Sequence, residues 1–146
     1  VFRQAPANVV QEMAEAVGVR DVQLFQFLEP DAERLESLGF RVYRVHEVPT
    51  GCNALPPLRP DPSPEHPAVL DVAPGVSNIT FPWEILGPEA PPGTFISGNV
   101  RPENVCALLT HHPYGIDLCS GVEMDVGHKD PDRLELLFDT LRTALG

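Results

Sequence analysis

The sequence predicts an α/β fold in which parallel strands alternate with crossover helices. Helical and strand patterns follow one another along most of the chain, and the apolar strand patterns end on polar or small residues. The length of 146 residues allows one domain with a real core, but it falls short of the roughly 200 residues of a full eight-unit α/β barrel. We therefore expect one domain, or part of one, over residues 1–146.

The chain begins with a strand followed by a helix and a second strand. Val1 and Phe2 already fit a strand, so we expect a strand over residues 1–3 and a further segment upstream of it. Apolar residues at a helical period predict a helix over residues 6–17. The short segment 21–25 then predicts the second strand.

The next helix and strand lead into a proline-rich segment. Residues 31–38 have a helical apolar face that ends at Gly39, and the alternation in "RVYRVHEV" predicts a strand over residues 41–48. Residues 49–67 contain seven prolines, each of which lacks a backbone N–H donor and has a fixed φ angle. This composition excludes a helix and predicts an irregular, Pro-rich loop insertion.

The second half of the chain continues the alternation. Buried-strand patterns occur at residues 68–72, 94–97 and 116–120. A helix is predicted over residues 101–110, and a last helix is predicted over residues 130–145 with Asp130 as its cap. The chain therefore predicts six parallel strands.

Charge and cysteine content exclude several classes of protein. Ten basic and twenty-one acidic residues give a net charge of −11, which repels nucleic acid and anionic membrane surfaces. No apolar run approaches the roughly 20 residues that cross a bilayer, so we expect a soluble protein without a membrane partner. Cys52, Cys106 and Cys119 lack a C-x-x-C spacing and predict neither disulfides nor a zinc site. We therefore expect the protein in a reducing compartment, either the cytoplasm or another compartment such as a plastid.

Other candidate ligands have simpler interpretations. Apolar neighbours in the sequence predict that Cys106 and Cys119 are buried, inert thiols. His111 and His112 precede a proline and lack accompanying carboxylates, which favours surface residues over metal ligands. We expect neither a metal nor a cofactor.

Two strand ends carry small residues that suit an anion. Ser97, Gly98 and Asn99 follow one strand before a predicted helix, where backbone N–H groups and the positive helix end would face a ligand. Ser120 and Gly121 repeat the arrangement one unit later, and barrels often bind phosphate at their last two units. The alternative is that these glycines only permit tight turns.

The same stretches resemble a known family. "FISGNVRPENVCALL" and "PYGIDLCSGVEMDVGHKDPDRLELL" are similar to the last two βα units of the phosphoribosylanthranilate isomerase family, which have the patterns S-G-G-L-x-P-E-N-V and G-V-D-x-S-S-G-V-E-x-x-x-G-x-K-D. "DVQL" at residues 21–24 resembles the fourth-strand V-Q-L-H-G, and "VLD" at residues 69–71 resembles the sixth strand. Phe81 and Trp83 match the F-D-W that follows.

The resemblance implies an incomplete (β/α)8 TIM barrel whose first two βα units are absent from this chain. It implies a tryptophan-pathway isomerase that performs an Amadori rearrangement without a cofactor. Asp71 would be the general acid, with a turn cap as the alternative, and Gln23 would contact the substrate. Ser97, Gly98, Asn99, Ser120 and Gly121 would bind its phosphate. The cysteine base of the family's K-I-C-G motif has no counterpart here.

Departures from the family pattern suggest altered function. Phe25 and Gln26 replace H-G, putting a bulky side chain near the substrate, and the mobile G-G-x-G-K-T-F-D-W loop is changed over residues 75–83.

Two hypotheses about function follow from these observations. The chain is an isomerase, or one domain of a fused enzyme, impaired when it acts alone; or it is a catalytically dead relative that serves as a structural or interaction module. A protein partner or an N-terminal segment would cover the open barrel edge.

Overall fold

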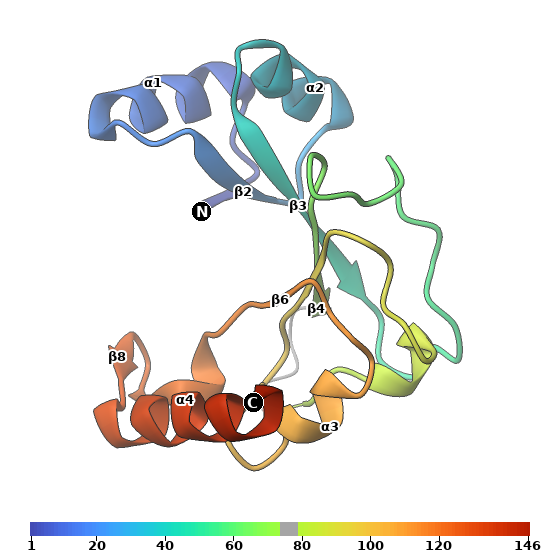
Figure 1. The fold of residues 1–146 in the computed structure, drawn as a ribbon. Helices are drawn as coiled ribbons and strands as arrows, with labels where there is room; N and C mark the ends of the chain where they lie inside the picture. The colour runs from blue at the N-terminus through green and yellow to red at the C-terminus, as the bar shows by residue number, and fades with distance from the viewer. Residues whose placement is uncertain (74–78) are drawn as a thin grey trace.

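The protein forms a curved, six-stranded sheet whose strands are all parallel and follow one another in chain order (Figure 1). The structure is a computed structural model, and it describes residues 1–73 and 79–146. The strands are β1 (Phe2–Arg3), β2 (Asp21–Phe25), β3 (Arg41–Val48), β4 (Ala68–Val72), β5 (Thr94–Ile96) and β6 (Gly115–Ile116). The predicted parallel α/β sheet is therefore confirmed.

The last strand is shorter than predicted. β6 contains only Gly115 and Ile116, whereas the apolar pattern suggested residues 116–120. Cys119 has φ −131° and ψ −104°, which takes the backbone out of the strand region, and Ser120–Val122 form a 3₁₀ turn, η2. An antiparallel hairpin that we did not predict follows, made by β7 (Glu123–Asp125) and β8 (His128–Lys129).

The helices agree with the predictions except for one. α1 (Ala7–Val17), α2 (Glu29–Ser37) and α4 (Pro131–Leu145) form as expected, and the Asp130 carboxylate accepts from two N–H groups of the first turn of α4. α3 spans only Val105–Leu109, so the predicted start at residue 101 is wrong. The Asn104 side chain accepts from the Arg101 N–H at 2.7 Å and donates to the Asn99 carbonyl at 3.0 Å, which holds this segment in a turn.

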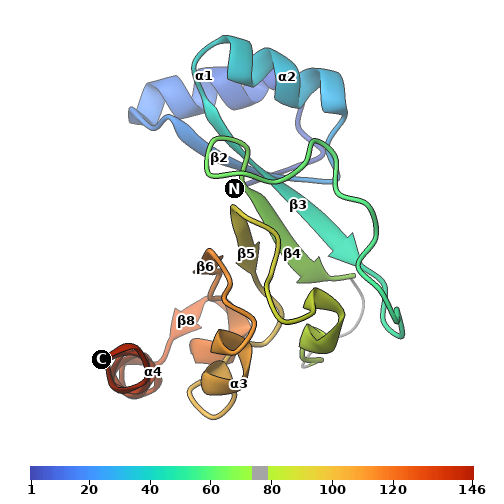
Figure 2. The same cartoon turned by 45° about the vertical axis from the view of Figure 1, so that its right-hand side comes forward.

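The apolar core lies on the helix-covered face of the sheet and has two parts. One lies where α1 and α2 cover β2 and β3, and it includes Val10, Leu24 and Leu35. The other lies where α3, α4 and the 3₁₀ helix η1 (Trp83–Leu86) pack against β4 and β5, and it includes Leu70 and Ile96. The two helix groups are visible at opposite ends of the sheet in Figure 2.

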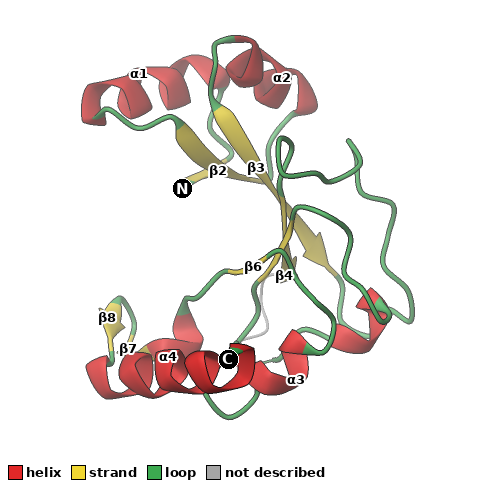
Figure 3. Cartoon of the chain, viewed as in Figure 1, coloured by secondary structure: helices red, strands yellow, loops and turns green. Residues whose placement is uncertain are grey.

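The Pro-rich segment 49–67 is irregular, as predicted, and it joins β3 to β4 without a helix or strand (Figure 3). Leu58 anchors it in the core, and Arg41 donates to the carbonyl of Pro64 at 2.7 Å. A Cβ at Gly93 would lie 2.2 Å from the backbone of Ser63, so the segment runs directly against the start of β5. The segment therefore packs on the sheet as part of the fold.

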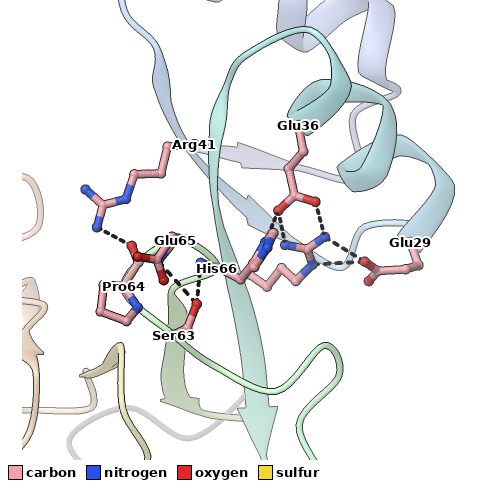
Figure 4. Close-up of polar contacts among 8 residues, drawn as sticks. Glu29, Glu36, Arg41, Ser63, Pro64, Glu65 and His66 are labelled. Carbon is pink, nitrogen blue, oxygen red and sulfur yellow. Dashed lines mark hydrogen bonds and ion pairs between the residues drawn. The ribbon is translucent and has the colours of Figure 1, made fainter.

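A buried arginine separates the two halves of the core. The Arg44 guanidinium on β3 is only 3% exposed, and it donates to Glu29 at 2.7 Å and to Glu36 at 2.7 Å. Figure 4 shows the side chains of Glu29, Glu36 and His66 gathered at this point. Burial disfavours the charged form of Arg44, but its hydrogen bonds to these two carboxylates outweigh burial and raise its pKa. His66 of the Pro-rich segment lies 3.0 Å from the same Glu36 carboxylate. The cluster thus joins β3, α2 and the Pro-rich segment.

Replacing Glu36 should destabilise the protein in a pH-dependent way. The hydrogen bonds from Arg44 and His66 lower the pKa of Glu36 below its usual 4.5. Its stabilising effect is therefore complete above pH 4.5 and lost as pH falls through the lower folded-state pKa. We expect Glu36→Gln to cost about 2 kcal/mol of unfolding free energy at pH 7, because Arg44 loses a charged partner.

Urea denaturation at pH 7 and at pH 3 measures this effect, with Glu33→Gln on the same helix as the control. Glu33 is exposed and is not bonded to Arg44. An equal loss of stability in both variants, or a loss for Glu36→Gln that does not shrink at pH 3, would contradict the assigned role.

Candidate active site

The strand register decides which side chains share the polar face of the sheet. Glu47 pairs with Asp71, and Val69 pairs with Phe95. Since side chains alternate between faces along a strand, Glu47, Asp71, Ser97 and Asp117 belong to the face that the helices leave uncovered. All of them lie at the carboxyl end of their strands, which is where α/β proteins bind ligands.

Asp71 is half-buried within this row. Burial raises the pKa of its carboxyl group, and the negative charges of Asp117 and Glu47 add to that effect. Hydrogen bonds from the Val72 N–H, at 2.8 Å, and from the Ser97 side chain oppose it without cancelling it. A carboxyl group that holds its proton more tightly than usual is suited to act as a general acid.

Two side chains hold Glu47 beside Asp71, the amide of Gln26 and the guanidinium of Arg3. The Gln26 amide donates to its carboxylate at 3.1 Å, and the Arg3 guanidinium lies 3.8 Å away. Gln26 has a left-handed backbone with φ 49° and stands where the family pattern has glycine. Gln26 keeps the left-handed backbone conformation that glycine adopts freely, and its longer side chain bonds to Glu47.

Gln23 reaches across the concave face to the last strand. Its amide donates to the Asp117 carboxylate at 3.3 Å, although the two residues are 94 positions apart. Tyr43, Phe95 and Tyr114 form an edge-to-face series from β3 to the start of β6, with ring centroids 5.5 Å apart in each pair. Gln23 therefore helps to bring the two ends of the row together.

The two predicted anion turns lie against one another. A Cβ at Gly121 would meet the carbonyl oxygen of Val100 at 1.9 Å, so only glycine allows the second turn to approach the first. Gly98 and Asn99 both have positive φ, 86° and 58°. Ser97 is buried and bonded to Asp71, which ties the first turn to the acid. The backbone N–H groups of Gly98, Ser120 and Gly121 bond to no acceptor within the described residues.

Several neighbouring residues differ from expectation. Cys106 and Cys119 are exposed, so the prediction that they are buried is wrong. α3 buries Val105 and Leu108, and Cys106 points away from that packed side.

Lys129 fixes the β7–β8 hairpin, because it donates to Glu123 at 2.8 Å and to the Cys119 carbonyl at 3.0 Å.

The remaining predictions concern the loop over residues 75–83, metal binding and membrane spans. The changed loop over residues 75–83 lies partly outside the described residues, while its Phe81 and Trp83 are buried in the core. In residues 1–73 and 79–146, no group of His, Cys, Asp and Glu could hold a metal ion. No helix of that same part is long and apolar enough to cross a membrane.

Comparison with known proteins shows the family. The profile described as N-(5'phosphoribosyl)anthranilate (PRA) isomerase matches residues 1–140. The chain belongs to the phosphoribosylanthranilate isomerase family. The N-(5'-phosphoribosyl)anthranilate isomerase of Gloeothece citriformis is 30% identical, with 97% of this chain and 68% of that protein covered. The homologue from Acaryochloris marina is 29% identical, with 99% and 70% covered.

Solved structures of phosphoribosylanthranilate isomerases share the fold. The enzyme from Thermus thermophilus superposes with a TM-score of 0.75 at 24% identity, covering 97% of this chain and 70% of that one. A phosphoribosylanthranilate isomerase in complex with reduced 1-(o-carboxyphenylamino)-1-deoxyribulose 5-phosphate superposes with a TM-score of 0.71 at 19% identity, covering 97% and 69%. The chain thus spans about 70% of the length of these isomerases.

The sequence analysis did not identify two carboxylates that the fold brings near Asp71, Glu47 and Asp117. The signal for Glu47 was present, because the alternation in "RVYRVHEV" places it on the same face as Tyr43. Asp117 stands at the aspartate of the family pattern G-V-D, one residue beyond the observed end of β6. Their closeness to Asp71 depends on register, which the sequence alone did not show.

Replacing Asp71 should stabilise the protein at neutral pH. The folded state raises the pKa of this carboxyl group above 3.8, so ionised Asp71 destabilises the fold once pH exceeds the raised pKa. Asp71→Asn should increase the unfolding free energy at pH 7 by about 1 kcal/mol, and the gain should vanish near pH 3 where the wild-type carboxyl is protonated. Thermal denaturation at both pH values tests this. Lower stability at pH 7 would show that Asp71 is a structural cap.

Proposed function

We propose that this chain supplies the six carboxyl-terminal βα units of an eight-stranded phosphoribosylanthranilate isomerase barrel, with an Amadori rearrangement as its chemistry. The observation that supports this most is the half-buried Asp71, with its raised pKa, beside two glycine turns at the carboxyl edge of a parallel sheet. The proposed substrate is phosphoribosylanthranilate, an intermediate of tryptophan biosynthesis.

The chemistry needs one proton donated and one removed. Asp71 donates its proton to the ring oxygen of the ribose, the C1′–O bond breaks, and the ring opens to a Schiff base. A base then removes the C2′ proton, and the electron pair of that bond forms the C1′–C2′ double bond of an enol-amine. The enol-amine tautomerises to the amino-ketose when C1′ gains a proton and the C2′ hydroxyl loses one. Ser97 and the Val72 N–H orient the Asp71 carboxyl group, while Glu47 and Asp117 favour its protonated form.

The substrate phosphate is assigned to the paired turns. Backbone N–H groups of Gly98, Ser120 and Gly121 have no acceptor within the described residues, and a phosphate could accept from them. The side-chain amide of Asn99, which donates to the Thr80 hydroxyl at 3.4 Å, stands at the same turn. The contact of Gly121 with Val100 holds the turns close enough to act on one group.

The carbon base is the component that we propose lies outside this chain. His46, on β3, alternates onto the helix-covered face with Arg44, away from Asp71. The first and last strands, β1 and β6, each pair on one side only and leave backbone groups exposed. Two further βα units, in the same protein or in a partner, would cover those edges and supply the base.

A genetic test separates this proposal from its alternative. Residues 1–146 alone should not support growth of a tryptophan auxotroph that lacks the isomerase, because a missing general base costs about 10²–10⁴-fold in rate. Co-expression with the first two βα units of a related isomerase should restore growth, and Asp71→Ala should abolish it again.

Growth with residues 1–146 alone that depends on Asp71 would place the base inside this chain, with the exposed Cys119 as the first residue to test. Failure of every combination would favour a catalytically dead module with an interaction role. The replacement of the family's H-G by Phe25 and Gln26 is the observation that favours that second candidate.

Phosphate binding can be measured without turnover. If Kd is about 1 mM, about 20 mM inorganic phosphate should stabilise the fold by about 1.8 kcal/mol and raise Tm by roughly 5 °C. Asn99→Asp should abolish the shift, because it adds a negative charge at a turn whose positive φ aspartate tolerates. Asn8→Asp, exposed on α1, and potassium chloride at equal ionic strength are the controls. An unchanged Tm would mean that the turns serve only the fold.

A further inference from the structure

Two glutamines stand directly after the first two strands, in the same uncommon backbone conformation. Gln4 follows β1 and Gln26 follows β2, with φ angles of 51° and 49°. The Gln4 N–H donates to the Phe25 carbonyl at 3.0 Å, which places the two glutamines side by side. Glycine would adopt a left-handed φ with less strain, so the backbone alone does not explain a glutamine at either position.

The two side-chain amides form one directed chain of hydrogen bonds that ends on Glu47. The Gln4 amide donates to the Gln26 side-chain oxygen at 3.0 Å. The Gln26 amide donates in turn to both carboxylate oxygens of Glu47, at 3.1 Å and 3.4 Å. An ionised carboxylate only accepts hydrogen bonds, so the NH₂ end of Gln26 faces Glu47 and its oxygen is left to accept from Gln4. The direction of the chain therefore suits an ionised Glu47.

Glu47 and Asp71 form a pair of carboxyl groups on neighbouring strands. They are register partners in β3 and β4, and such strands lie about 4.8 Å apart. Burial is the largest cause of the raised pKa of Asp71, and the negative charges of Asp117 and Glu47 add to it. Two carboxyl groups this close compete for a proton, and hydrogen bonds to the ionised form of one leave the proton with the other.

The remaining charges around the pair do not favour Asp71 over Glu47 as strongly. Within the described part of the chain, the charged groups that face Asp71 are Glu47 on β3 and Asp117 beyond β6. Arg3 on β1 lies 3.8 Å from Glu47 and is 52% exposed, so solvent weakens their attraction. Gln26 is neutral, and it stabilises the Glu47 carboxylate without cancelling the charge that acts on Asp71.

This inference rests on the proposed function. We propose that Gln26, oriented by Gln4, is a positioning residue that keeps Glu47 ionised and so assigns the proton of the carboxyl pair to Asp71. A glycine at the position of Gln26 has no side chain to make these bonds. The change from glycine to glutamine thus keeps the proton on the group that donates it to the ribose ring.

Carbon-13 NMR of the carboxyl groups in the 146-residue chain tests this without turnover. The pKa of Asp71 should fall in Gln26→Gly, because a Glu47 without its donors takes part of the proton and repels less. Glycine suits a φ of 49°, so this variant should fold. Glu47→Gln should lower the pKa of Asp71 at least as far. Gln26→Gly should add nothing in that background, because Gln26 acts only through Glu47.

His112→Gly is the matched control. His112 is exposed, has the same φ of 49°, and lies before β6 rather than after it. This variant should leave the pKa of Asp71 unchanged. The inference is overturned if that pKa is the same in wild type and Gln26→Gly, or if Gln26→Gly lowers it equally with and without the Glu47 carboxylate.

The barrel completed by co-expression gives a second measurement. Its kcat should fall with rising pH as the acid loses its proton, and Gln26→Gly should move that fall to lower pH with little change in KM. An unchanged pH profile would also overturn the inference.

The two proposals fail separately. If the pKa of Asp71 depends on Gln26 but the genetic test fails, the reaction is wrong and the positioning role stands. If growth is restored but that pKa is independent of Gln26, the reaction stands and the positioning role is wrong.

Discussion

Six parallel strands are held in one register, and that register decides which side chains meet. Glu47 lies beside Asp71 and Val69 lies beside Phe95 because the neighbouring strands pair in this way. Side chains alternate with a period of two, so a slip of one residue would turn Asp71 toward the helices and Leu70 toward the solvent. Since Leu70 is fully buried in the core, the apolar face fixes the register, and the polar face inherits its arrangement.

The Arg44 cluster shows how the fold holds a segment that forms neither helix nor strand. A segment without helix or strand lies over β3, and it contributes Leu58 as its one residue in the buried core cluster. Arg44 lies on β3 between Val42 of one apolar cluster and Val48 of the other, and two carboxylates of α2 accept its hydrogen bonds. The buried guanidinium is thus paired with carboxylates, and His66 of the segment bonds to one of them, so the segment is tied to α2 by a polar contact as well as by Leu58.

How much the sequence could predict depends on whether a feature is local. The strand over residues 41–48 was predicted with its observed bounds, because its alternation is contained in eight consecutive residues. The turn at Arg101 could not be predicted, because it depends on where the Asn104 side chain bonds. Asp71 was found through a motif, whereas its raised pKa depends on Glu47 and Asp117, which only the fold brings near it. Cys106 was misjudged because apolar sequence neighbours do not decide which side of a helix faces the core.

The order of the strands in the sheet has a consequence for folding. Each strand pairs only with the strands before and after it in the chain, so the sheet can grow one unit at a time with short loop closures. The bond between Gln23 and Asp117 is different, because it joins residues 94 positions apart. We expect it to form after the intervening strands have paired. The row of polar side chains at the carboxyl edge is therefore completed last, and a partly folded chain would have its apolar core before that row is complete.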